Sequence, residues 1–331
     1  MTQPAANTVP HACFLTWLEH RRTRELGARL GIDVIELISQ YSGWRRYVDL
    51  IPATIRLLWE RKPRVLLVQT PSIILAALSV VLRPFLGYKL LFDAHNEAVE
   101  PVVHTQFVAV MLARWLLARA DRVLVTNHQL AAAVAGRGGR PMVLWDPLPR
   151  PTAVSPQSLR GRFRIAVIST YASDEPFDAV LQAARAVSND VQFFVTGNPA
   201  KLTEAVRASV PPNVTLTGFL SEPDYWSMLA SCDAVMDLTT MDACLVCGAY
   251  EAIAVGRPLV LSNNAVSWDV FGGFGEFADN TPTGVVEALT RLRDRYAEIV
   301  AALPDLRRAF EDRWSAQASA LHAFIAEELR V

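Results

Sequence analysis

The sequence predicts an α/β protein built from two doubly wound parallel sheets that face each other across a cleft. Three observations carry this prediction. The chain has 331 residues, enough for two domains of ordinary size. Short apolar runs alternate with helical patterns along both halves, as in parallel sheets covered on both faces. A proline-rich stretch with little apolar periodicity lies between the halves.

We expect the first domain to cover residues 1–150 and the second to begin after a linker at 151–163. The strands of the first domain are expected at 11–17, 34–39, 64–70, 88–96, 122–127 and 142–149. Its helices are expected at 19–31, 49–62, 71–87, 102–120 and 129–138. The polar ends of these strands should meet at one edge of the sheet, where open α/β sheets bind ligands.

The second domain is expected to cover residues 164–305, followed by a helix at 306–331. The expected strands are 163–170, 191–197, 213–219, 234–238 and 259–262, and the expected helices are 176–187, 243–256 and 282–303. The last helix is long enough to return to the first domain.

Composition excludes several classes of protein. The formal net charge is −1, whereas a general nucleic-acid binder shows a basic excess. Four cysteines do not make a disulfide framework in so long a chain, and the lone pair Cys244 and Cys247 lacks the partners of a zinc site. No apolar run reaches the ~20 residues of a spanning helix. We therefore expect a cytoplasmic protein with no metal and no other cofactor.

The stretch from Ala234 to Ser262 has the clearest pattern in the chain. It combines a buried strand, a polar loop, an apolar helix ending near Gly256 and a second buried strand. Backbone N–H groups at the start of such a helix can hold an anion. Glu251 is an acid inside the apolar helix, so it either faces solvent or needs a ligand or partner.

This stretch, from Gly248 through Pro258 to Ser262, resembles the nucleotide-sugar half of GT-B glycosyltransferases, especially the retaining group with a Glu-x7-Glu motif (family 4-like). The resemblance implies two Rossmann-like domains and a nucleotide-sugar as co-substrate. It implies that Glu251 contacts the donor ribose. The first motif acid is replaced by Ala243, and the nearest acid is Asp242.

The resemblance also indicates further donor-binding residues at the ends of the strands in the second domain. They are Ser169, Thr170, Gly197, Phe219, Leu220, Gly248 and Tyr250. Family members usually carry an Arg and a Lys after the first strand of this domain. The corresponding loop, 169–175, contains neither, so the charge of a diphosphate has to be compensated from elsewhere.

The first domain is expected to bind the acceptor at the start of its first helix. Three arginines, Arg21, Arg22 and Arg24, follow His20 there. Guanidinium groups and free N–H groups at a helix start suit a phosphate. A solvated basic face is the alternative explanation of the same pattern.

The polar end of the strand at 88–96 provides the candidate catalytic residues. His95 can move a proton near neutral pH, Asp93 can orient the ring, and Glu97 is a competing base. The sequence around His95 resembles membrane-associated glycosyltransferases that extend polyprenyl-phosphate-linked sugars. The apolar helix that begins at Pro71 also suits shallow contact with a lipid surface.

The resemblance to these glycosyltransferases implies a hexosyltransferase of bacterial exopolysaccharide or glycolipid assembly. Its acceptor would be polyprenyl-phosphate-linked or a glycolipid, and it would contact the inner face of the cytoplasmic membrane peripherally. Two alternatives remain, because fold does not determine reaction. One is a catalytically silent GT-B partner subunit, which the missing acid and cations favour. The other is a nucleotide-sugar epimerase.

Overall fold

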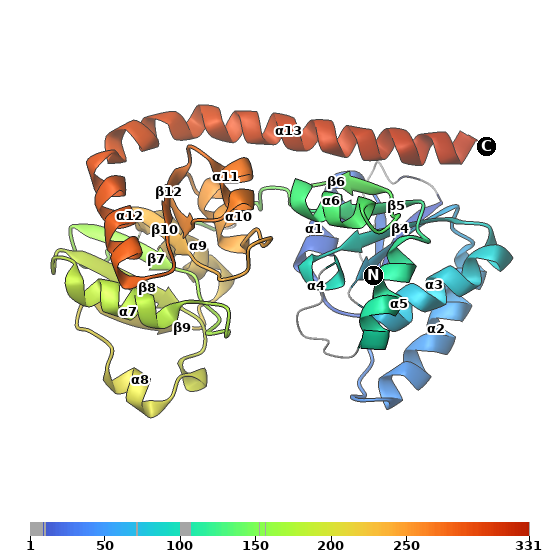
Figure 1. Cartoon of the computed structure of the whole chain (residues 1–331), viewed down its shortest axis with the longest axis horizontal. Helices are drawn as coiled ribbons and strands as arrows, with labels where there is room; N and C mark the ends of the chain where they lie inside the picture. Colours follow the sequence, from blue (N-terminus) through green and yellow to red (C-terminus); the bar gives the residue numbers. More distant parts are fainter. Residues whose placement is uncertain are drawn as a thin grey trace. The chain divides into compact units, whose positions relative to one another are not determined.

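A computed structural model describes residues 9, 11–70, 72–99, 107–151, 153–155 and 157–330. The chain forms two compact units. Unit 1 comprises Met1–Pro147 and Asp312–Val331, and unit 2 comprises Leu148–Glu311. The two units are described separately below (Figure 1).

Unit 1 is built on a six-stranded sheet in the order β2-β1-β3-β4-β5-β6, with every neighbouring pair parallel. Apolar runs produce these strands, and β3 is buried along its whole length because helices cover both faces. The strands are β1 (Ala12–Thr16), β2 (Asp33–Glu36), β3 (Val65–Thr70), β4 (Lys89–Ala94), β5 (Arg122–Val125) and β6 (Pro141–Val143).

The helices of unit 1 begin and end at residues suited to those positions. Ser72 and Asn127 accept hydrogen bonds from the backbone N–H groups of Leu75 and Leu130, which caps α3 and α6. The helices are α1 (Arg21–Leu30), α2 (Arg45–Arg61), α3 (Ile73–Leu86), α4 (Asn96–Val99), α5 (Phe107–Leu117) and α6 (His128–Ala135). The first residues of the helix expected at 102–120 lie outside the described residues.

Unit 2 contains a second all-parallel sheet, in the order β12-β11-β10-β7-β8-β9. This is the Rossmann strand order, which reverses direction between β7 and β10. The strands are β7 (Phe163–Val167), β8 (Val191–Thr196), β9 (Val214–Gly218), β10 (Ala234–Asp237), β11 (Leu259–Ser262) and β12 (Gly275–Ala278). The sequence analysis missed β12, a four-residue strand at the edge.

The helices of unit 2 include three that the sequence analysis did not predict: α8, α9 and α11. The elements are α7 (Phe177–Ala186), the 3₁₀ turn η1 (Pro199–Lys201), α8 (Glu204–Ala208), α9 (Glu222–Ser231), α10 (Cys247–Ala254), α11 (Ala265–Phe271) and α12 (Pro282–Asp294). The stretch predicted as a linker is attached to α9, where Ser227 and Ser231 accept hydrogen bonds from the N–H groups of Ser155 and Gln157.

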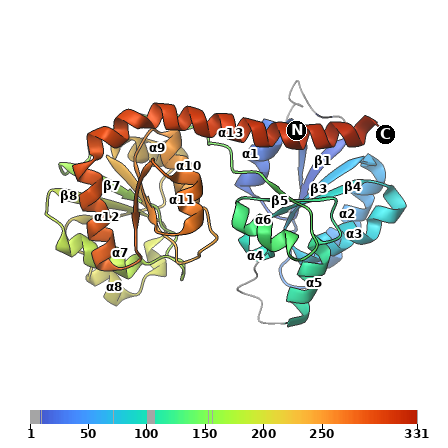
Figure 2. The same cartoon turned by 45° about the horizontal axis from the view of Figure 1, so that its top comes forward.

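The final helix, α13 (Tyr296–Arg330), is one continuous helix (Figure 2). The expectation of two helices that separate near residue 304 is therefore wrong. Pro304 lies inside α13, and buried Ile299 and Phe310 hold the helix on unit 2 on either side of it. In unit 1, the Trp314 indole donates to the Trp145 carbonyl at 3.1 Å.

Two parallel sheets with flanking helices confirm the predicted α/β, doubly wound class. The helix expected at 243–256 begins at Cys247 instead of Ala243. Asp237 explains the later start, because its carboxyl group accepts the N–H of Gly248 at 2.9 Å and so caps the helix there. In the described part of the chain, no helix combines the length and apolar character needed to cross a membrane.

Candidate functional site

The predicted catalytic and acceptor residues of unit 1 meet at the carboxyl end of β4. Asp93 is the buried second-last residue of that strand. His95 lies just beyond the strand, with its Nε2 3.6 Å from Asp93 Oδ2. Arg22 reaches the same carboxylate from α1, with Nη2 3.0 Å from Asp93 Oδ1. Arg22 and Asp93 are 71 positions apart in the sequence. They meet because β1, which leads into α1, and β4 both pair with β3 in the parallel sheet.

Arg22 is buried between two acids. Its guanidinium also contacts Asp146 and donates to the carbonyl of Leu144 at 3.1 Å. Burial alone would raise the pKa of Asp93, but Arg22 and His95 hold it below its ordinary value. Asp93 is therefore ionised and fixes the guanidinium and the imidazole edge on one side of the site. The sequence analysis missed Asp146, which lies beyond β6 and has no local signal.

His20 forms a second imidazole beside His95. The two rings pack edge to face with centroids 4.9 Å apart, and His20 Nδ1 lies 3.1 Å from the Thr23 hydroxyl. Burial and the neighbouring His95 lower the pKa of His20 to about 4. His20 is therefore uncharged near neutral pH and cannot contribute positive charge to a phosphate site.

The remaining predicted residues of unit 1 are placed differently from one another. Arg24 is exposed and forms a bidentate pair with Glu36, at 2.8 and 2.7 Å. Arg21 is exposed at the start of α1. Glu97 lies in α4, and its side chain is outside the described part. Arg21 and Arg24 are thus exposed, whereas Arg22 is buried.

In unit 2, Glu251 lies on α10 and is only 6% exposed. The exposed-face alternative is therefore wrong. The hydroxyl of Tyr225, on α9, donates to Glu251 Oε2. A buried carboxylate needs such donors, because burial without them is costly. The sequence analysis did not identify Tyr225, since the two residues are 26 positions apart and on different helices.

Asp237 ends β10 beside the switch in strand order. Besides capping α10, it leaves so little space that a Cβ on Gly248 would lie 2.5 Å from its Oδ2. Burial, opposed by the hydrogen bond from Gly248 and assisted by the nearby charge of Glu251, raises the pKa of Asp237 to about 8. Near neutral pH its carboxyl group is largely protonated. Only a glycine fits at position 248, where α10 starts against this strand.

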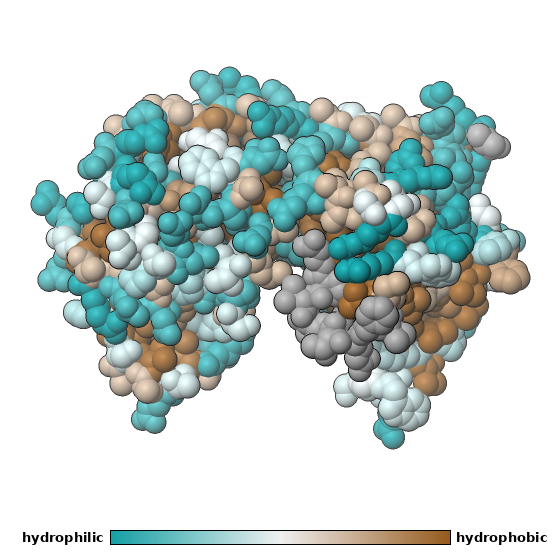
Figure 3. Space-filling model, in the orientation of Figure 1, coloured by the Kyte–Doolittle hydropathy of each residue, from teal (hydrophilic) through white to brown (hydrophobic). Residues whose placement is uncertain are grey.

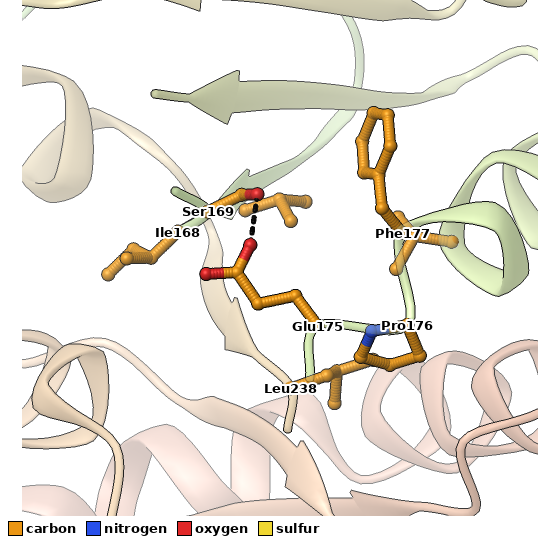
Figure 4. Close-up of a pocket in the computed structure, with 8 residues that line it drawn as sticks. Ile168, Ser169, Glu175, Pro176, Phe177 and Leu238 are labelled. Carbon is orange, nitrogen blue, oxygen red and sulfur yellow. Dashed lines mark hydrogen bonds between the residues drawn. The ribbon is translucent and has the colours of Figure 1, made fainter. Parts of the chain in front are cut away.

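The loop after β7 contains the predicted residues Ser169 and Thr170. Both hydrogen-bond to the carboxylate of Glu175. Ser169 Oγ lies 2.5 Å from it (Figure 4), and Thr170 Oγ1 lies 2.8 Å from it. A small pocket lies here, lined by Ser169, Glu175, Phe177 and Leu238 among others. Gly197, after β8, has φ +99°, and a Cβ there would lie 2.3 Å from the Ser169 carbonyl oxygen. Gly197 therefore permits the two loops to touch.

The other predicted donor residues lie at different depths. Phe219 is 84% exposed after β9, and Leu220 follows it half-buried. Asp242 is exposed in the loop before α10. Tyr250 is buried, with its ring 5.1 Å from Phe271 and 5.9 Å from Phe310. The ring of Tyr250 belongs to an aromatic cluster of the core.

Lys201 is a residue that the sequence analysis did not include. It ends η1, and its Nζ donates to the carbonyl of Thr170 at 2.8 Å. Lys201, from the loop after β8, thus places a positive charge next to the loop after β7, which contains no Lys or Arg. Among the described residues, no group of three His, Cys, Asp or Glu side chains is arranged to hold a metal ion.

Comparison with solved structures identifies the fold. The chain matches crystal structures of HepE from Anabaena in complex with UDP and glucose and with UDP-glucose, with a TM-score of 0.71, 12% identity and coverage of 96% of this chain and 99% of HepE. It matches sucrose-phosphate synthase from Thermosynechococcus elongatus (TM-score 0.68, 14% identity, 91% and 84% covered). It also matches the lipopolysaccharide outer core galactosyltransferase WaaB, with a TM-score of 0.67, 13% identity and coverage of 95% of this chain and 99% of WaaB.

These matches extend over nearly the whole chain, so the protein has the two-sheet fold of GT-B glycosyltransferases. No family model and no curated protein matches its sequence. At 12–14% identity the likeness concerns the fold. Assignment to the Glu-x7-Glu group is not confirmed.

Proposed function

We propose that the protein is a glycosyltransferase that uses a nucleotide-sugar donor, held by unit 2. One observation carries the proposal: Glu251, buried on α10 and oriented by Tyr225, stands next to the reversal of strand order in a Rossmann sheet. Ligands bind at such reversals in open α/β sheets. The solved structures of HepE with UDP and UDP-glucose, which share the fold, support a nucleotide-sugar as the ligand.

A thermal-shift comparison tests the donor site. The purified protein is heated with UDP, GDP, TDP or ADP and with their common sugars. A ligand that binds only the folded state raises the melting temperature. We expect one nucleotide to stabilise the protein, and Glu251→Ala to lose that stabilisation. Glu287→Ala is the matched control, because Glu287 is an exposed acid on α12 of the same unit.

A flat response to every nucleotide would contradict this proposal and favour the silent-partner alternative. If one nucleotide binds, incubation with its sugars distinguishes transfer from epimerisation. A transferase releases the nucleoside diphosphate as the sugar passes to an acceptor or slowly to water, whereas an epimerase returns an isomeric nucleotide-sugar.

We propose that His95 is the catalytic acid–base residue and that Asp93 positions it. Ionised Asp93 lies 3.6 Å from His95 Nε2 and is fixed by Arg22. A His held in this way can move a proton near pH 7. His95→Gln should lower kcat roughly 10²–10⁴-fold. Donor binding should remain, since the donor is assigned to unit 2.

We propose a lipid-linked acceptor and peripheral contact with a membrane, through the face formed by α2, α3 and α5. Helix α3 packs between the other two. The exposed apolar side chains of this face include Trp44 at the start of α2, Phe85 on α3 and Trp115 on α5. Figure 3 shows the corresponding hydrophobic surface. The guanidinium of Arg119 lies 4.4 Å from the Trp115 ring centroid, and that of Arg45 lies 6.0 Å from the Trp44 ring. Paired Trp and Arg suit the boundary of an anionic lipid surface.

Co-sedimentation with vesicles tests this contact. Wild-type protein should sediment with vesicles that contain phosphatidylglycerol, and more weakly with neutral vesicles. Phe85→Ser should reduce binding severalfold, because Phe85 is 71% exposed on α3. Val300→Ser, an exposed apolar position on unit 2, is the control. Equal binding by both variants would contradict the assignment.

A further inference from the structure

The loop between β7 and α7 stands where a Rossmann sheet usually receives an anion. The strand order reverses between β7 and β10, so the ends of these strands open to a ligand. Residues 168–176 connect β7 to α7 at this edge, and the two ends of this loop, Ile168, Ser169, Glu175 and Pro176, line the pocket of Figure 4. Backbone N–H and hydroxyl groups in such loops commonly bind phosphate oxygens.

In this protein a side chain of the same loop occupies those donors. The backbone N–H of Thr170 lies 2.9 and 3.0 Å from the two carboxylate oxygens of Glu175. The hydroxyls of Thr170 and Ser169 donate to the same carboxylate at 2.8 and 2.5 Å. Three donors therefore converge on one anionic group, as they would on a phosphate.

Neighbouring elements hold the donors in place independently of Glu175. Thr196 Oγ1 accepts a hydrogen bond from the N–H of Ser169 at 3.1 Å. The carbonyl oxygen of Ser169 lies so close to Gly197 that a Cβ there would be 2.3 Å away. Lys201 Nζ is bonded to the carbonyl of Thr170 at 2.8 Å. The donors would thus remain in position if the carboxylate left, with a cation beside them.

The backbone of the loop also carries strain. Tyr171 has φ +56°, a left-handed conformation that is unfavourable for an aromatic residue. Its N–H is held by the Ser169 hydroxyl at 3.0 Å, and its ring packs against Phe177 at 5.0 Å. These two contacts hold the strained conformation without a direct contribution from Glu175.

We infer that Glu175 is an internal anion that occupies the phosphate-binding loop and has to swing out before the diphosphate of a donor binds there. Two anionic groups cannot share the same donors, because like charges repel and each needs the hydrogen bonds. The carboxylate therefore competes with the ligand and lowers its affinity. This inference rests on the proposed donor site in unit 2.

The competing explanation is that Glu175 only supports the loop. The two roles predict opposite effects of removing the charge. If Glu175 competes, its loss strengthens binding of a diphosphate. If it supports the loop, its loss disorders Ser169 and Thr170 and weakens binding.

Calorimetric titration of the full chain with UDP and with pyrophosphate decides between them. Replacing charge-assisted hydrogen bonds costs a ligand roughly tenfold to a hundredfold in affinity. Glu175→Gln should therefore bind both ligands tighter by about that factor than wild type. Asp178→Asn is the matched control, because Asp178 is an exposed acid in the first turn of α7. It should change affinity less than about threefold.

Two further variants separate this inference from the proposed function. Adding Glu251→Ala to Glu175→Gln should weaken binding of UDP and leave binding of pyrophosphate, which has no ribose, at the level of Glu175→Gln. If wild type binds UDP through Glu251 but Glu175→Gln binds no tighter, only the internal-anion inference is overturned. If no variant binds either ligand, both proposals are overturned. Glu175→Ala replaces the Gln variant if the latter does not fold.

Discussion

The two units present opposite chemistry at the ends of their central strands. In unit 1, the buried guanidinium of Arg22 joins two acids, Asp93 and Asp146. In unit 2, the carboxyl groups of Glu251 and Asp237 are met by neutral donors, the Tyr225 hydroxyl and the Gly248 N–H. Charge compensation is therefore built into unit 1, whereas unit 2 keeps an acid protonated.

Their surfaces differ in the same direction. Most of the exposed large apolar side chains lie in unit 1, on and around α2, α3 and α5, and few lie in unit 2. Contiguous exposed apolar surface usually marks an interaction site. This contrast supports our proposals of lipid contact and acid–base chemistry in unit 1 and of nucleotide binding in unit 2. Three predictions follow the contrast between the units from the largest expected effect to the smallest.

Arg22→Ala should destabilise unit 1 by about 3–5 kcal/mol, because it leaves Asp93 and Asp146 without their shared cation. Urea unfolding followed by circular dichroism measures the loss. Arg21→Ala is the control at an exposed neighbouring position and should change stability by less than about 1 kcal/mol. Equal effects of the two substitutions would show that Arg22 is not the cation that holds the site.

Asp237→Asn should remove a pH dependence from unit 2. The pKa of Asp237 rises from 3.8 to about 8 on folding, so the folded state binds the extra proton between those values. Its contribution to stability is complete below pH 4 and is lost as pH rises through about 8. The asparagine can still accept the Gly248 N–H and does not titrate.

We therefore expect the variant to gain on wild type as pH increases, by roughly 2–4 kcal/mol between pH 5 and pH 8. Thermal melts at several pH values measure the difference. A constant difference across that range would contradict the assignment of a buried, protonated Asp237.

His20→Gln should have a smaller effect of opposite sign in unit 1. The pKa of His20 falls from 6.5 to about 4 on folding, so the unfolded chain binds the extra proton. Its contribution therefore falls as pH decreases from about 6.5 to about 4. The side chain is half-buried, and solvent screening reduces the effect to about 1 kcal/mol. The stability of the variant relative to wild type should therefore be higher at pH 4.5 than at pH 7 by about that amount, measured by thermal melts of both proteins. A difference between the two proteins that does not change with pH would contradict this.

Most of the fold could be predicted from local patterns. Apolar runs such as β3 and β8 are buried along their whole length, and capping residues such as Ser72 mark helix starts. Short elements with weak apolar patterns, such as β12 and α8, gave no such signal. Pro304 predicted a helix break that tertiary packing on unit 2 overrides.

The candidate site was harder to predict, because its decisive contacts are distant in sequence. His95 and Asp93 were identified from a polar strand end, but Asp146 meets Arg22 only through the order of the sheet. Tyr225 reaches Glu251 from another helix. Glu175 is close in sequence to Ser169, yet only the conformation of the loop shows that the carboxylate folds back onto it.

Hydrogen exchange with and without UDP tests the central claim most directly. A ligand slows exchange where it orders the backbone. We predict that saturating UDP protects α10 and the loop after β7 in unit 2 and leaves α2, α3 and α5 of unit 1 unchanged. The protection should disappear in Glu251→Ala and persist in Glu287→Ala. Protection confined to unit 1, or equal protection in both variants, would contradict the assignment of the donor to unit 2.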